Sequence, residues 1–207
     1  GLPFPLALAC AALLSAAVGM VVGLPALRVK GIYLGMATLA FGFIVEEVMA
    51  RWEKVTGGNA GLHVHTPTLF GWELDSTNEF YGLCLVLCVG ATLAIANLMR
   101  SSTGRAFVAI RDSEISAQSM GIHIARYKTM SFALSAALAG LGGALYAHKI
   151  QFLSPEQFSI IQSIDLLLMV VVGGLGSIHG AFFGAIFLIV MPQMIAQGKD
   201  FLPPAIG

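Results

Sequence analysis

The chain of 207 residues is 57% hydrophobic and 11% charged, and its formal net charge is zero. A globular chain averages roughly 45 to 50% apolar and about 25% charged residues, so lipid is the expected surrounding of most of these side chains. Without a basic excess to neutralise phosphates, a nucleic-acid partner is not expected. The composition therefore predicts an all-α, polytopic membrane protein without a large aqueous domain.

About six transmembrane helices are expected, because a hydrocarbon core about 30 Å thick needs roughly 20 apolar residues of helix. Four apolar stretches cover residues 2–27, 32–49, 80–99 and 129–147. The fifth, residues 155–172, has a predicted capping box in which Ser154 is the N-cap, Pro155 the first helical residue and Gln157 the reciprocal partner. The sixth covers residues 178–195, and a re-entrant pair is the alternative for the last two.

Both ends of the chain are expected to lie inside a longer protein, because it begins without Met and finishes in a Pro-rich connection. The orientation follows from the basic residues, which are enriched in cytoplasmic loops. Alternating spans put four of them on one side, at Arg51, Lys54, Lys149 and Lys199. The other side then holds seven and is predicted to be cytoplasmic: Arg28, Lys30, Arg100, Arg105, Arg111, Arg126 and Lys128.

The polar stretch at residues 100–128 is predicted to contain a short docking helix. Ser113 or Asp112 can cap its start, and Gly121 can end it in a left-handed conformation after Met120. The side chains expected to contact a partner are Ile115 and Met120 in a cleft, with Glu114, Arg111 and Arg105 around them. The alternative is a solvated loop whose charges only set the topology.

Two other features are candidate sites. Asp165 lies inside an apolar segment, where a carboxylate indicates either a translocation role or a structural hydrogen bond near a helix end. The segment of Thr56, Gly57, Gly58 and Asn59 is either an extracytoplasmic gate or docking surface, or an ordinary glycine turn. No metal site is expected, because neither the histidines nor the cysteines have ligand spacing.

Glycines with helix-packing spacing occur throughout the apolar segments. Residues four apart on a helix lie on one face, and small residues there let helix backbones approach closely in lipid. The glycines assigned to such contacts are Gly19 with Gly23, Gly31 with Gly35, and Gly180 with Gly184, and a flexible gate is the alternative for them. Gly173, Gly174 and Gly176 are assigned to a tight turn between packed helices. The Lys and Ser or Thr of a P-loop do not follow this turn, so the chain is not expected to be an enzyme with its own ATPase site.

Several motifs in order resemble the LivM-type permease family of branched-chain amino acid ABC importers. They begin with LRVKGIYLG at Leu27, TGGNAGL at Thr56, TGRAFVAIRD at Thr103 and VVGGLGSIHG at Val171. The resemblance implies an importer permease domain over residues 1–207 in the bacterial cytoplasmic (inner) membrane. It also implies partners: a LivH-type permease subunit, two cytoplasmic ATPase subunits that bind ATP and Mg, and an extracytoplasmic substrate-binding protein.

The same resemblance implies that residues 100–128 are a cytoplasmic coupling loop related to the EAA loop of ABC importers. Ala117 and Gly121 keep the end of its spacing, whereas Ile115 stands where Glu is expected and Glu114 is one residue early. Leucine, isoleucine and valine are the implied cargo. Other amino acids, amides or urea are alternatives, as are two other classes of protein, an ion-coupled secondary carrier using Asp165 and a non-transporting scaffold.

Overall fold

A computed structural model describes residues 4–27, 29, 31–58, 61–63, 68–69, 72–73 and 77–201. The chain divides into two compact units, Gly1–Gln157 and Phe158–Gly207. Apolar α-helices dominate both units, and four of the helices in the described part are long and apolar enough to cross a membrane. The protein is therefore an all-α, polytopic membrane protein, as its composition predicts.

The four long helices of the first unit correspond to the first four predicted spans. They are α1 (Phe4–Ala26), α2 (Ile32–Arg51), α4 (Thr77–Arg100) and α7 (Ile124–Ile150). The largest boundary error is at α7, which begins at Ile124 and not at residue 129. Arg126 and Lys128 belong to its first turns, because polar side chains are compatible with a helix that extends beyond the apolar region.

Helices α1 and α7 pack against each other through small residues. A Cβ added at Gly19 of α1 would lie 2.5 Å from the Cβ of Ala136 and 2.7 Å from the carbonyl oxygen of Phe132. At Gly23, the added Cβ would lie 3.3 Å from the Cβ of Phe132. The predicted packing role of these two glycines is thus present, and Phe132 of α7 is their common neighbour.

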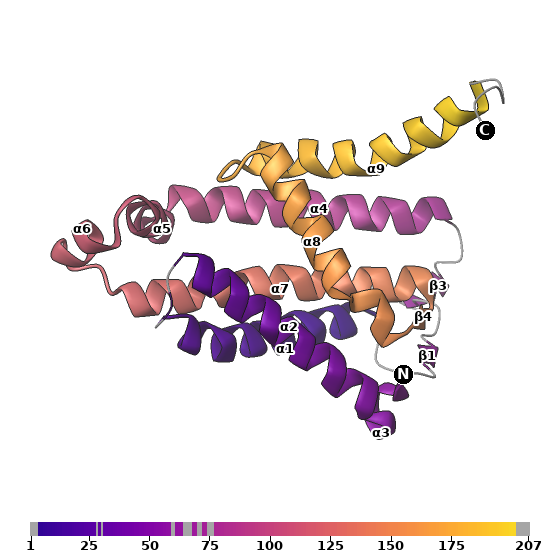
Figure 1. Ribbon diagram of the computed structural model, residues 1–207, viewed down its shortest axis with the longest axis horizontal. Helices are drawn as coiled ribbons and strands as arrows, with labels where there is room; N and C mark the ends of the chain where they lie inside the picture. Colours follow the sequence, from indigo (N-terminus) through magenta and orange to yellow (C-terminus); the bar gives the residue numbers. More distant parts are fainter. Residues whose placement is uncertain are drawn as a thin grey trace. The chain divides into compact units, whose positions relative to one another are not determined.

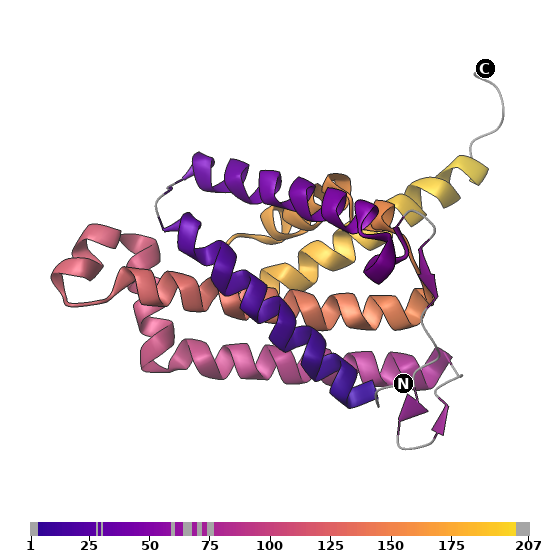
Figure 2. The same ribbon diagram turned by 90° about the horizontal axis from the view of Figure 1, so that it is seen from below.

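Short elements gather at the two ends of the first unit (Figures 1 and 2). One end carries α5 (Ser102–Asp112) and α6 (Glu114–Ser119). The opposite end carries α3 (Glu53–Thr56), β1 (Leu62–His63), β2 (Thr68–Leu69), β3 (Trp72–Glu73) and β4 (Phe152–Leu153). Antiparallel pairing of β1 with β4 and of β2 with β3 fixes the chain at this end, so the connection after α3 and the segment after α7 meet there.

The second unit consists of α8 (Ile160–Gly173) and α9 (Ile178–Phe201). The contact between them runs through glycine, because a Cβ added at Gly173 would meet the carbonyl of Gly180 and one at Gly184 would meet the carbonyl of Met169. Gly174 and Gly176 form the turn, with φ of 103° and 89°. Ser177 then begins α9 by accepting a hydrogen bond of 2.9 Å from the N–H of Gly180.

The predicted capping box at the start of the fifth helix is wrong. Residues Pro155–Phe158 form a 3₁₀ turn, and α8 begins only after Ser159, whose backbone is extended. The side-chain Oε1 of Gln157 is buried without a hydrogen-bond partner among the described residues, so it caps nothing. The 14 residues of α8 span about 21 Å, shorter than a hydrocarbon core of about 30 Å. Whether residues 155–195 form two full membrane spans or a re-entrant pair stays open between the two predictions.

Candidate functional site

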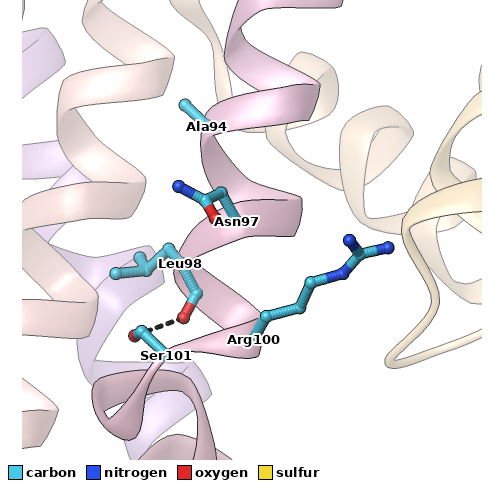
Figure 3. A pocket seen from close by; sticks show the side chains of 5 residues that line it. All are labelled: Ala94, Asn97, Leu98, Arg100 and Ser101. Carbon is cyan, nitrogen blue, oxygen red and sulfur yellow. Dashed lines mark hydrogen bonds between the residues drawn. The ribbon is translucent and has the colours of Figure 1, made fainter.

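The site is built at the corner where α4 ends and α5 begins. The hydroxyl of Ser101 donates to the carbonyl of Leu98 at 2.6 Å and accepts from the N–H of Gly104 at 3.4 Å (Figure 3). It therefore satisfies a carbonyl left open at the end of one helix and an N–H left open at the start of the next. A Cβ at Gly104 would collide with the backbone of Met99, so this tight corner accepts only glycine there.

A small open pocket of about 450 Å³ lies beside this corner, lined by Ala94, Asn97, Leu98, Arg100 and Ser101. The guanidinium of Arg100 extends away from the side of α4 on which Ala94, Asn97 and Leu98 lie (Figure 3). The pocket offers one amide and one hydroxyl and no paired acid and base. In the part of the chain that the structure describes, no group of three or more His, Cys, Asp and Glu side chains could hold a metal ion.

Ser113 lies between α5 and α6 and caps the end of one and the start of the other. Its backbone N–H donates to the carbonyl of Ala109 at 3.0 Å, which closes α5. Its hydroxyl accepts from the N–H of Ser116 at 3.3 Å, which opens α6. Of the two predicted caps, Ser113 is therefore the one used, and Asp112 instead pairs with Arg111 at 3.1 Å.

Gly121 ends α6 in the left-handed conformation that the sequence predicts, with φ of 83°. The N–H of Gly121 donates to the carbonyl of Gln118 at 3.0 Å, and the N–H of Ile122 donates to the carbonyl of Ala117 at 3.1 Å. These two bonds are the Schellman arrangement, which satisfies the open carbonyls of a helix end. The turn after α6 is therefore a defined hydrogen-bonded structure.

The two sides of α6 differ sharply in exposure. Ala117 is only 1% exposed, whereas Ile115 and Met120 are 78% and 81% exposed. Exposure of these two large apolar side chains to water is unfavourable. Ala117 thus anchors the helix while Ile115 and Met120 project from it.

The polar side chains expected around Ile115 and Met120 come from α5 and α6 and also have contacts within the chain. Glu114 forms an ion pair of 2.6 Å with Lys128, and the Glu114 side chain is 27% exposed. Arg105 donates to the carbonyl of Arg100 at 3.4 Å, and the Arg111 side chain is 62% exposed. The nearby ammonium group of Lys128 holds the Glu114 carboxylate against α7, and the expected contact of Glu114 with a partner stays a prediction.

At the opposite end of the unit, the candidate gate residues form a local turn. The hydroxyl of Thr56 lies 2.6 Å from the carbonyl of Met49 and accepts from the N–H of Gly58 at 3.2 Å, so both of these contacts of the hydroxyl are local. Gly57 ends α3 with a left-handed backbone, and Gly58 also has a positive φ. Asn59 lies outside the described residues.

Other predicted residues belong to other helices. Asp165 is exposed on α8 of the second unit. Gly31 and Gly35 do not make the predicted helix contact within the described residues, since an added Cβ at either would have no heavy atom within 4 Å. Gly31 instead precedes α2 with a φ of 60°. Within the described residues, the spacing of Gly31 and Gly35 is therefore not accompanied by a helix contact like that of Gly19 and Gly23.

The sequence reasoning missed α5 and the residues that hold the two loop helices to α7. Phe107 of α5 packs edge to face on Tyr127 of α7, with ring centroids 6.0 Å apart. Lys128, counted only as a topology marker, pairs with Glu114. Ser101 followed by apolar residues at helical spacing was the available signal for α5; nothing in the local sequence signals the ion pair.

Residues 1–205 match the sequence model of a family described as "Branched-chain amino acid transport system / permease component". The chain belongs to this family. Its members are permease components of transport systems, and the apolar helices of this chain agree with a multi-pass membrane protein. No solved structure matches the chain.

Curated relatives fall into two groups by their names. The chain is 35% identical, over 97% of its length, to the high-affinity branched-chain amino acid transport system permease protein LivM of Escherichia coli, and covers 53% of that protein. A probable LivM of Methanocaldococcus jannaschii is 23% identical over 98% of the chain and is covered to 59%. The autoinducer 2 import system permease protein LsrC of Klebsiella pneumoniae is 29% identical over 51% of the chain, with 34% of it covered. The chain spans about half the length of the LivM relatives.

Proposed function

We propose that the chain is part of the permease subunit of an ATP-driven importer of leucine, isoleucine and valine. The observation that carries the proposal is α6, a capped helix that presents Ile115 and Met120 at one end of the long helices. The similarity to LivM proteins over nearly the whole chain supports the cargo. The chain would supply the translocation path and no catalytic group.

The physical requirement of such an importer is a rigid element between the membrane helices and the nucleotide-binding subunits. In this proposal α6 is that element, docking on a cytoplasmic ATPase subunit that binds ATP and Mg. A LivH-type permease completes the membrane part, and an extracytoplasmic binding protein delivers the amino acid at the end that carries α3 and β1. The complex lies in the bacterial cytoplasmic membrane with residues 100–128 on the cytoplasmic side.

The cargo is tested by ATP hydrolysis of the complete complex in proteoliposomes. Leucine, isoleucine or valine with the binding protein is expected to stimulate hydrolysis and to accumulate inside the vesicles. Amides and urea, given under the same conditions, are the controls. Stimulation by a control solute alone would contradict the cargo and leave the permease role standing, whereas an absence of uptake with every solute in a complex that hydrolyses ATP would contradict the permease role.

The docking and orientation are tested by labelling a single cysteine at Met120. In a background with Cys10, Cys84 and Cys88 replaced by alanine, Met120→Cys is expected to react with an impermeant maleimide in inside-out vesicles and to be shielded by the bound ATPase subunits. Leu62→Cys, 44% exposed at the opposite end of the unit, is the matched control and should react only in right-side-out vesicles. Labelling of both cysteines from the same side would refute the orientation.

A further inference from the structure

The first turns of α7 receive both helices of the loop through neighbouring residues. Tyr127 packs on Phe107 of α5, and Lys128 pairs with Glu114 of α6. The rings of Phe107 and Tyr127 are perpendicular, at 90°, which is a favourable edge-to-face arrangement. Two consecutive residues of one long helix thus hold two separate helices of the loop.

The Glu114–Lys128 ion pair differs from the other ion pairs between described residues. Its side chains are 27% and 17% exposed, whereas those of Arg111 and Asp112 are 62% and 63% exposed, and Glu47 and Arg51 are more than half exposed. Attraction between charges grows as water is removed, and exposed pairs contribute little because water screens them. The shielded pair is therefore the one expected to hold its helices together.

Other attachments of α6 to the long helices lie at its far end and along a groove, as far as the described residues show. An open groove of about 540 Å³ borders it, with Leu27 after α1, Gln118 of α6 and Ile124 of α7 among its lining residues. At its far end, the Schellman turn through Gly121 joins α6 to α7. The ion pair ties the first turn of α6 to α7, and the turn ties its last, so both ends of this six-residue helix are attached to the same long helix.

We propose that Lys128 is a positioning residue, and that its ion pair with Glu114 makes α6 and α7 move as one body. A force on α6 would then reach the membrane-spanning part of α7, and from Phe132 pass to α1 at Gly19 and Gly23. Without the pair, bending at the turn after α6 would absorb the movement. The inference rests on the proposed function, in which α6 docks on the ATPase.

The test is a charge-exchange cycle in the complete importer. Glu114→Lys and Lys128→Glu are each expected to lower amino acid uptake per ATP hydrolysed roughly tenfold, a change that loss of a partly shielded ion pair can produce in an equilibrium. Combining them restores the opposite charges and is expected to restore the ratio. Asp112→Lys, at the exposed neighbouring pair, is the control and should leave it unchanged.

Amide exchange of residues 114–119 provides a readout that does not depend on transport. Each single charge reversal is expected to weaken the protection of α6 against amide exchange, and the double reversal is expected to restore it. If the single variants keep wild-type amide exchange and wild-type uptake per ATP, the ion-pair proposal is overturned and the proposed function is not. The same holds if the double charge reversal restores neither the amide protection nor the uptake per ATP. If charge reversal prevents assembly, Glu114→Gln and Lys128→Met remove the ion pair without reversing a charge, and each is expected to lower uptake per ATP and to weaken the protection of α6. Failure of the wild-type complex to import would instead contradict the proposed function, and amide exchange would still decide the role of the pair.

Discussion

Alanine at Gly19 is expected to lower the free energy of unfolding by about 1–3 kcal/mol, the usual cost of forcing extra volume into a packed contact. The added Cβ would lie 2.5 Å from the Cβ of Ala136 and 2.7 Å from the carbonyl oxygen of Phe132, and the backbone oxygen cannot rotate away as a side-chain end can. Helices α1 and α7 must therefore move apart. In lipid this loses van der Waals contact that no hydrophobic effect replaces.

The matched control is Gly42→Ala in α2, where an added Cβ has no heavy atom within 4 Å among the described residues. Alanine has the higher helix propensity by up to about 1 kcal/mol, so this variant should be unchanged or more stable. Thermal unfolding of each full-length variant in the same detergent gives the comparison. Equal midpoints for Gly19→Ala and Gly42→Ala would show that the close approach of α1 to α7 does not stabilise the protein.

The long helices and the ends of α6 could be predicted because their signals are local. A long apolar run identifies α1 or α4 without knowledge of any neighbour. The start of α6 depends on Ser113 and its end on Gly121, each of which acts within a few residues of its own position. The positions of these helix ends can therefore be predicted from the local sequence.

The remaining features depend on contacts between distant segments. Gly19 with Gly23 and Gly31 with Gly35 have the same spacing, yet only the first pair has another described helix against it. Spacing identifies a face of a helix and not what covers it. Similarly, Ser154 and Ser159 both precede plausible helix starts. The strand β4 pairs with β1 just before Ser154, and a 3₁₀ turn follows Ser154. The helix α8 begins only after Ser159.

Of the candidate site, the exposure of the two apolar side chains was predicted, and the ion pair of Glu114 was not. Ile115 and Met120 are exposed as expected because a short capped helix leaves little room to bury both. The partner of Glu114 was missed because Lys128 lies across a turn, and its approach depends on the path of the chain through Gly121. A charge pair of this kind follows from the fold, so composition and charge counting could not identify it.

Valine at Gly121 is expected to reduce uptake per ATP strongly while leaving the membrane helices folded. The φ of 83° is unfavourable for any L-residue with a Cβ by roughly 1–2 kcal/mol, and a β-branched side chain makes it a genuine outlier. No heavy atom lies within 4 Å of an added Cβ, so the cost is in the backbone and not in packing. Relief of this strain breaks the bonds from Gly121 and Ile122 to the end of α6.

Substitution by asparagine separates the backbone requirement from the loss of glycine itself. Asparagine enters the left-handed region more readily than other residues with a Cβ, so Gly121→Asn should retain most of the uptake per ATP, with Gly121→Ala between Asn and Val. Both Gly121→Val and Gly19→Ala add a side chain to a glycine, but one strains a turn in open space and the other obstructs a helix contact. Valine should therefore change coupling more than thermal stability, and alanine at Gly19 the reverse. If Gly121→Val supports normal uptake and hydrolysis, a rigid left-handed end of α6 is not what transmits the movement.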